Sequence, residues 1–186
     1  MTKTHMIRME PMTEESFAPF GALWDAAERP ADRRVIKETG YTYAGRTTAS
    51  IIWQPRDGLS FTVLERHFGV TQSFVQLSGA PAVVCVAAPT RTEAPADVPD
   101  PADVRAFLID PAKGYSFARG TWHSLNRHPL APPGATFLIL NSDPNPTQMV
   151  DYETGELTVY ADLGADAVTE SSALGEAPGV TFEITM

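Results

Sequence analysis

The chain has 186 residues, of which 43% are hydrophobic and 20% are charged, and its formal net charge is -9. This length and composition are those of a globular protein with one domain and a sizeable core. The negative charge and the lack of a Lys/Arg cluster argue against nucleic acid as a partner. No apolar run approaches the ~20 residues that a membrane helix needs, and residues 1–5 are polar. The sequence therefore predicts a cytoplasmic protein that does not bind membranes.

One short helix is predicted near the start of the chain. Thr13 suits the N-cap position, acidic residues follow in the first turn, and Gly21 can end the helix. Phe17 and Phe20 are expected to face the core. Residues 22–48 mix loop signals with one candidate strand at 41–44, so no other element is predicted there.

The most informative pattern lies between residues 60 and 79. Leu59, Phe61 and Val63 alternate on one face of a predicted strand, and the same face continues with Glu65 and His67. A carboxylate and an imidazole thus stand where core residues are expected. A strand end that reaches solvent would give the same pattern, and alternation alone does not decide between the two.

The rest of the chain reads mostly as short strands joined by turns. Gly69 can bend the chain before a strand at 72–77, and a proline-rich exposed loop is expected at 89–101. The single cysteine, Cys85, lies in an apolar run and is expected to fill the core. Further strands are predicted at residues 49–54, 80–88, 104–110, 115–119, 135–141, 156–163 and 180–185, with a loose tail at 164–179. Many strands with one helix predict an all-β antiparallel sandwich or small barrel.

A second group of polar residues follows the proline-rich loop. Arg119 alternates with Tyr115 and Phe117, and His123 comes shortly after Gly120. The pattern directs one guanidinium and one imidazole toward the same cavity, although a histidine in a surface loop is the alternative.

Two blocks of the chain resemble the motifs of the cupin superfamily. The first runs from Glu65 through His67 and Gln72 to Gly79, and the second covers residues 114–126. The sequences of these blocks are most similar to those of the bacterial ureidoglycolate lyases, which share the E-R-H block, the G-x-Q-x-F block and the R-x-x-W-H block. The resemblance implies a single cupin domain over residues 1–186, with residues 9–163 resembling the family and 164–186 as a C-terminal extension. The implied fold is a double-stranded β-helix, also called a jelly roll, with a short N-terminal helix.

The same resemblance implies a lyase that splits ureidoglycolate into glyoxylate and urea during allantoin and purine degradation. Such a reaction needs a base for the hydroxyl proton and an acid for the leaving nitrogen. Glu65 or His67 is the expected base and His123 the expected acid. The expected substrate-binding residues, for a small carboxylate substrate, are Gln72, Arg119, Trp122 and Asn141. No cofactor is required, although Glu65, His67 and His123 could hold a divalent metal ion weakly. The resemblance also implies a homodimer.

Three positions differ from the residues that are usual in the motifs of that family. Ala118 and Ser124 stand where histidines are usual, and Asn141 stands where an aspartate is usual. The substrate could therefore be a closely related 2-hydroxy acid. Two other classes remain open: a metal-dependent cupin oxygenase or isomerase, and a non-catalytic cupin that binds a small carboxylate.

Overall fold

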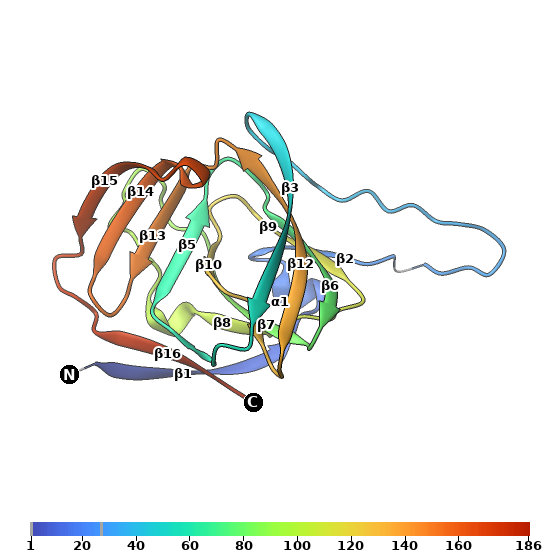
Figure 1. Cartoon of the computed structure of the whole chain (residues 1–186), viewed down its shortest axis with the longest axis horizontal. Helices are drawn as coiled ribbons and strands as arrows, with labels where there is room; N and C mark the ends of the chain where they lie inside the picture. Colours follow the sequence, from blue (N-terminus) through green and yellow to red (C-terminus); the bar gives the residue numbers. More distant parts are fainter. Residues whose placement is uncertain (1, 27) are drawn as a thin grey trace.

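Two facing β-sheets make up most of the molecule (Figure 1). The computed structural model describes residues 2–26 and 28–186. The larger sheet has the spatial order β15 (Ala167–Ala173), β14 (Glu156–Asp162), β13 (Thr147–Asp151), β5 (Val63–His67), β10 (Trp122–Ser124), β7 (Ala82–Ala87), β8 (Arg105–Leu108), β1 (Lys3–Pro11), β16 (Val180–Thr185) and β4 (Ser60–Phe61), and β11 (His128–Pro129) also pairs with β7. The smaller sheet has the order β2 (Gly21–Trp24), β9 (Gly114–Phe117), β6 (Ser73–Gly79), β12 (Gly134–Asp143) and β3 (Arg46–Pro55). This architecture confirms the predicted all-β, cupin-like fold.

Strand β7 separates two apolar cores. All six of its residues are buried, which confirms the prediction of a strand covered on both faces. Val84 and Val86 pack between the two sheets, against Phe74, Phe137 and other side chains of the smaller sheet. Val83 and Cys85 face the opposite way, as the two-residue period of a strand requires. Cys85 is therefore a core residue.

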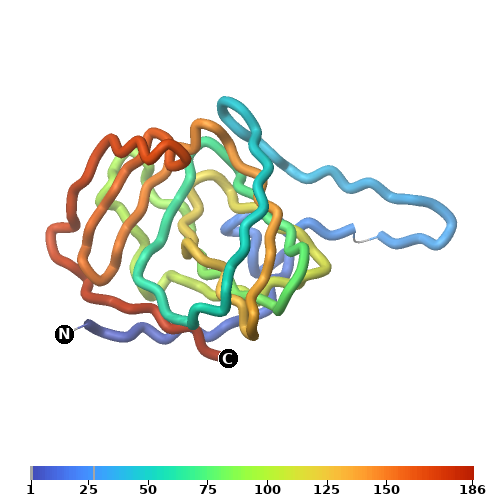
Figure 2. The backbone as a smooth tube through the Cα atoms, viewed as in Figure 1, coloured from blue at the N-terminus to red at the C-terminus, as the bar shows by residue number. Residues whose placement is uncertain are grey.

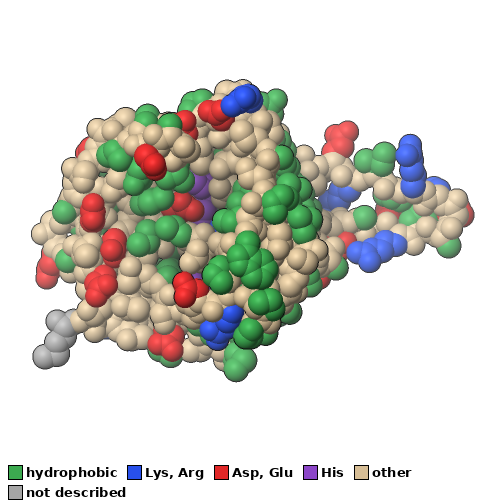
Figure 3. All heavy atoms as spheres, viewed as in Figure 1, with side chains coloured by type: hydrophobic (Ala, Val, Ile, Leu, Met, Phe, Trp, Pro, Cys, Tyr) green, Lys and Arg blue, Asp and Glu red, His purple; other side chains and the backbone are tan. Residues whose placement is uncertain are grey.

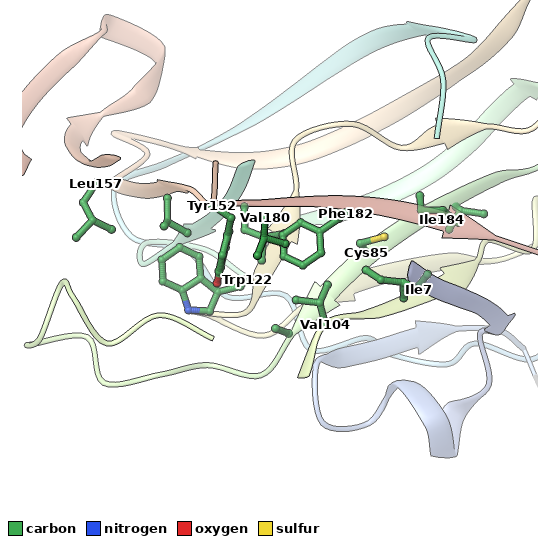
Figure 4. Packing of buried hydrophobic residues seen from close by; sticks show 14 residues of the cluster. Ile7, Cys85, Val104, Trp122, Tyr152, Leu157, Val180, Phe182 and Ile184 are labelled. Atoms are coloured by element: carbon green, nitrogen blue, oxygen red, sulfur yellow. The ribbon is translucent and has the colours of Figure 1, made fainter. Parts of the chain in front are cut away.

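The second core lies behind the larger sheet. Trp122, Tyr152 and Phe182 are fully buried in it, and the rings of Tyr152 and Phe182 meet edge to face at 5.1 Å (Figure 4). Because β16 supplies Phe182, the last strand of the chain helps to close this core. The first and last strands, β1 and β16, run parallel and side by side (Figure 2).

The predicted helix is a single turn, α1 (Glu14–Phe17). Thr13 caps it as expected, because its hydroxyl accepts a hydrogen bond from the backbone N–H of Ser16. Phe17 is buried and its ring contacts that of Phe107 at 5.4 Å. The prediction for Gly21 is wrong: this residue begins β2. Glycine is needed there because a Cβ would lie 1.8 Å from the carbonyl oxygen of Ser116 on the paired strand β9.

Several segments differ from the sequence-based prediction. The sequence did not predict β1, which is defined by its pairing with β16 and β8 and not by apolar alternation. The candidate strand at 41–44 is only an isolated bridge between Tyr43 and Val70. The preceding segment, residues 28–36, projects from the body of the molecule (Figure 1). The loose tail expected at 164–179 instead contains η2 (Leu163–Ala165) and the mostly exposed strand β15. A further short helix, η1 (Pro101–Asp103), follows the proline-rich loop. Among the described helices, none has the length and apolarity to cross a membrane.

Candidate active site

Glu65 and His67 lie on β5 and point between the two sheets. Both side chains are buried, and the alternate residues Leu64 and Arg66 point into the other core. The Arg66 guanidinium stacks 4.4 Å from the ring of Trp122 and donates two hydrogen bonds to Oε1 of Gln148. The alternation read from the sequence is therefore present in the fold. Arg66 is fully buried within the chain, so its side chain does not reach the molecular surface.

His123 reaches the same place from a distant part of the chain. Gly120 adopts a positive φ of 80°, which suits a residue without a side chain, and its N–H donates to the carbonyl oxygen of His67 at 2.8 Å. This turn lets β10 pair with β5, so that His123 lies directly opposite Glu65. Oε1 of Glu65 is 3.7 Å from Nδ1 of His123 and 3.9 Å from Nε2 of His67. Figure 3 shows histidine and acidic side chains at the bottom of a hollow between β5 and β3.

The two imidazoles are oriented by hydrogen bonds from their Nδ1 atoms. Nδ1 of His67 lies 2.7 Å from Oγ1 of Thr147, whose hydroxyl donates to the carbonyl oxygen of Asn145. Nδ1 of His67 therefore carries the proton, and Nδ1 of His123 likewise donates to the carbonyl oxygen of Ser124 at 3.1 Å. Both Nε2 atoms are buried and have no hydrogen-bond partner among the described residues. Each ring thus keeps an unprotonated Nε2 whose lone pair has no hydrogen-bond partner among the described residues.

Burial sets the protonation states of these groups. It raises the pKa of Glu65 to about 7, and the nearby positive charge of Arg127 opposes this shift. Burial also lowers the pKa of His67 to about 3, and Arg127 adds to that effect. The pKa of His123 falls well below its ordinary value because of burial, the neighbouring His67 and Arg127. Near pH 7 the imidazoles are neutral, whereas Glu65 exchanges its proton readily.

Glu65, His67 and His123 form one buried cluster. The guanidinium beside this cluster is that of Arg127, a residue that the sequence did not predict. Arg127 lies in the loop between β10 and β11, where no periodic pattern exists to reveal which way a side chain points. Its side chain is buried, with Cζ 3.7 Å from the centroid of the Phe74 ring. The one available signal was its position four residues after His123, directly after the end of the second motif.

The structure does not bring Arg119 into the cluster. β9 ends at Phe117, and the chain turns at Ala118–Gly120, so the alternation does not continue to Arg119. The prediction that Arg119 shares an inward face with Phe117 is therefore wrong. Its exposed side chain lines a surface depression with Phe68 and Thr92.

The other predicted binding residues lie in three different settings. Trp122 points away from His123 into the core, where its Nε1–H donates to Oγ1 of Thr90, so it is not a wall of this site. Asn141 lines a cavity of about 470 Å³ whose walls do not include the cluster, and its Oδ1 accepts from the N–H of Ser142. Gln72 is buried, and its Oε1 has no hydrogen-bond partner in the described part of the chain.

The cluster has the donor atoms of a metal site. Glu65, His67 and His123 each offer one ligand atom, and these atoms lie within 4.8 Å of one another. Neutral imidazole nitrogens and a carboxylate suit a divalent transition metal ion. The positive charge of Arg127 acts electrostatically on all three groups. It therefore repels a metal cation bound between them and weakens its binding. The arrangement is thus compatible with a weakly bound metal ion.

Comparison with known proteins shows which family this chain resembles. The model of the family described as ureidoglycolate lyase matches residues 4–158. The protein named ureidoglycolate lyase 1 of Rhizobium meliloti is 32% identical over 180 residues, covering 88% of this chain and 98% of its own length. Proteins named ureidoglycolate lyase from Pseudomonas paraeruginosa and Rhodobacter capsulatus are 34% and 33% identical, covering 67% and 69% of this chain and 75% and 80% of their own lengths. The chain therefore belongs to the ureidoglycolate lyase family.

Proposed function

We propose that this protein is a carbon–nitrogen lyase that splits ureidoglycolate into glyoxylate and urea. The observation that carries the proposal is the buried Glu65 carboxyl, with a pKa of about 7, beside two neutral imidazoles. A group that exchanges protons at neutral pH is what this reaction requires. Membership of the ureidoglycolate lyase family supports the choice of substrate.

In the proposed mechanism, ionised Glu65 removes the proton of the substrate hydroxyl. The oxygen electrons form the carbonyl of glyoxylate while the C–N bond breaks and its electron pair moves to the nitrogen of urea. Protonated Glu65 then delivers the proton to that nitrogen, so no proton is gained or lost. This step transfers no electrons to a cofactor.

The imidazoles have a different role from the one that their positions in the motifs suggest. A general acid at His123 would have to be an imidazolium, which burial disfavours, and His67 with a pKa of about 3 is a weak base. Their free Nε2 lone pairs can instead accept hydrogen bonds from the N–H groups of the substrate and hold the leaving urea next to Glu65. If a divalent metal ion binds to the three residues, it would supply a Lewis acid for the substrate oxygens.

Family membership disfavours an oxygenase, an isomerase or a non-catalytic carboxylate-binding cupin. An assay of urea and glyoxylate released from ureidoglycolate, with and without chelator, separates these alternatives. The lyase predicts turnover that survives the chelator and is unchanged or stimulated by added metal. Binding without product release would show a binding protein, and the absence of both binding and turnover would refute the assignment of substrate.

A cytoplasmic location and a homodimer belong to the same proposal. β3 is an edge strand of ten residues, and Ile51 and Trp53 on its outer face are 63% and 51% exposed. Hydrophobic side chains gather over β3 and β12 in Figure 3. A long edge strand with an apolar outer face suits self-pairing with a second copy around a two-fold axis.

A further inference from the structure

Arg127 is a buried cation without a counter-ion in the described chain. Only 2% of the residue is exposed, and no carboxylate among the described residues lies within ion-pair distance of it. Its Nη1 donates to the carbonyl oxygen of Leu125 at 3.0 Å, and its Nε lies 3.4 Å from Oη of Tyr115. Its Nη2 is buried and has no partner in the described part of the molecule. A buried guanidinium with an unused donor is costly unless a ligand completes it.

Packing holds this guanidinium in a defined position next to the candidate catalytic groups. Its Cζ lies 3.7 Å from the centroid of the Phe74 ring and 5.7 Å from that of Phe117. The Phe117 ring in turn stacks on His123, with centroids 4.4 Å apart. These contacts join Arg127 to the cluster through one aromatic layer, which restricts rotation of the guanidinium.

The backbone of the loop is also fixed. The N–H of Arg127 donates to Oε1 of Gln54 on β3, and the hydroxyl of Ser124 donates to the carbonyl oxygen of Asn126 at 2.8 Å. The loop is thereby tied to both sheets. A guanidinium held in this way loses little conformational entropy when it binds a ligand.

The hydrogen-bonding groups in this region are of two kinds. The acceptors are Glu65 and the free Nε2 atoms of His67 and His123, which match the O–H and N–H groups of a ureido alcohol. The free donor is Nη2 of Arg127, which matches an anionic oxygen. The two ends of a small 2-hydroxy acid therefore have separate complementary partners.

We propose that Arg127 binds the carboxylate of the substrate and so places the hydroxyl-bearing carbon next to Glu65. Arg119, the arginine that the motif suggested, is exposed in a turn beside Phe68 and Thr92 and lies outside this arrangement. The identity of the acid rests on the proposed function, whereas the anion subsite rests on Arg127 itself.

The test compares binding of glycolate with binding of its neutral amide, glycolamide, by ligand-observed NMR and calorimetry on the intact protein. The wild type is expected to bind glycolate at least tenfold more tightly than glycolamide. Arg127→Gln should weaken glycolate binding about ten- to hundredfold, the range expected for lost charge-assisted hydrogen bonds. It should also abolish the preference for the acid, which a merely structural change would not do. Arg127→Lys, which keeps the charge without the planar fork, should be intermediate.

Arg119→Gln is the matched control and should keep the wild-type preference. Equal or undetectable binding of the two ligands by the wild type would overturn the proposal, and so would an Arg127→Gln variant that still prefers glycolate. Should Arg127→Gln fail to fold in a thermal melt, the wild-type comparison and the lysine variant still decide the outcome. If ureidoglycolate is not cleaved but Arg127 governs glycolate binding, the proposed function fails and the subsite stands. If Arg127→Gln cleaves ureidoglycolate with an unchanged KM, the subsite fails and the proposed function stands.

Discussion

Glu65 owes its chemistry to its environment. On the surface its carboxyl would be ionised at neutral pH, but burial between the sheets raises its pKa to about 7. The charge of Arg127 keeps the shift from being larger, because it stabilises the carboxylate. The same burial prevents His67 and His123 from becoming cations. One group that exchanges protons and two neutral acceptors result from a single physical cause.

Glu65→Gln is expected to lower kcat on ureidoglycolate by about a hundredfold to ten-thousandfold, the usual contribution of one acid–base group. The amide has nearly the same shape as the protonated carboxyl, so the fold should remain. Release of urea and glyoxylate measures the effect. Glu156→Gln is the control, since Glu156 is exposed on β14. A Glu65→Gln variant with wild-type kcat would remove Glu65 from the mechanism.

Wild-type turnover should rise with pH through about 7, because the base must be ionised and the pKa of Glu65 is about 7. Stability should change in the opposite direction. The folded pKa of Glu65 lies above the ordinary value of 4.5, so its contribution to the free energy of unfolding is fully present below pH 4.5 and is lost as pH rises through 7.

The folded pKa of His67, about 3, lies below its ordinary value of 6.5. The contribution of His67 to the free energy of unfolding is therefore present above pH 6.5 and is lost as pH falls through 3.

Denaturant titrations between pH 4.5 and 7 should show that Glu65→Gln removes the loss of stability that the wild type has in this range. A curve that remains parallel to that of the wild type would contradict the buried, protonated carboxyl.

At the level of the element, β10 places a core residue and a residue of the candidate site next to each other in the sequence. Trp122 and His123 point to opposite faces, one into the core behind the larger sheet and the other toward Glu65. Their pairing partners on β5 and β7 hold this register. Moving the register by one residue would exchange the two side chains and destroy both the core and the site.

Substitution of Trp122 should therefore lower stability, whereas substitution of His123 should lower kcat. Trp122→Ala is expected to cost about 3–5 kcal/mol of stability by leaving a cavity, with turnover per folded molecule retained. His123→Ala should cost about tenfold or more in kcat through loss of a hydrogen-bond acceptor for the substrate. Thermal melts and steady-state kinetics on both variants provide the comparison. Unchanged turnover in His123→Ala would exclude the imidazole from the reaction.

At the scale of the whole molecule, the outer face of the smaller sheet carries a group of exposed apolar side chains. Ile51 and Trp53 on β3 and Leu77 on β6 are each more than half exposed, and all three point away from the core. Such a patch on a monomer usually marks an interface.

Trp53→Glu is expected to convert the proposed dimer into a monomer, because a charge would be buried in the proposed contact. Light scattering at micromolar protein concentration measures the mass. Val168→Glu changes an equally exposed apolar residue on β15 and should leave the mass unaltered. A monomeric wild type, or a Trp53→Glu dimer, would exclude pairing through this face.

Local pattern was sufficient for much of this protein. The two-residue alternation around Glu65 and His67, the doubly covered strand at β7, the cap of α1 and the spacing of His123 from Gly120 all follow from short stretches of chain. These features depend on backbone geometry, which neighbouring residues determine. From them the all-β fold was predictable, whereas the grouping of Glu65, His67 and His123 was expected only once the resemblance to the cupin motifs was added to the alternation.

The tertiary structure alone decided which guanidinium joins them. Arg119 was assigned to the site by extending a strand that in fact ends at Phe117, whereas Arg127 enters from a loop in which sequence spacing carries no direction. The strands β1 and β15 were likewise hidden, because long-range pairing defines them. Alternation reports which face of a strand a side chain occupies. It does not report where that strand stops or which distant segments pack together, since both depend on contacts formed only when the whole chain folds.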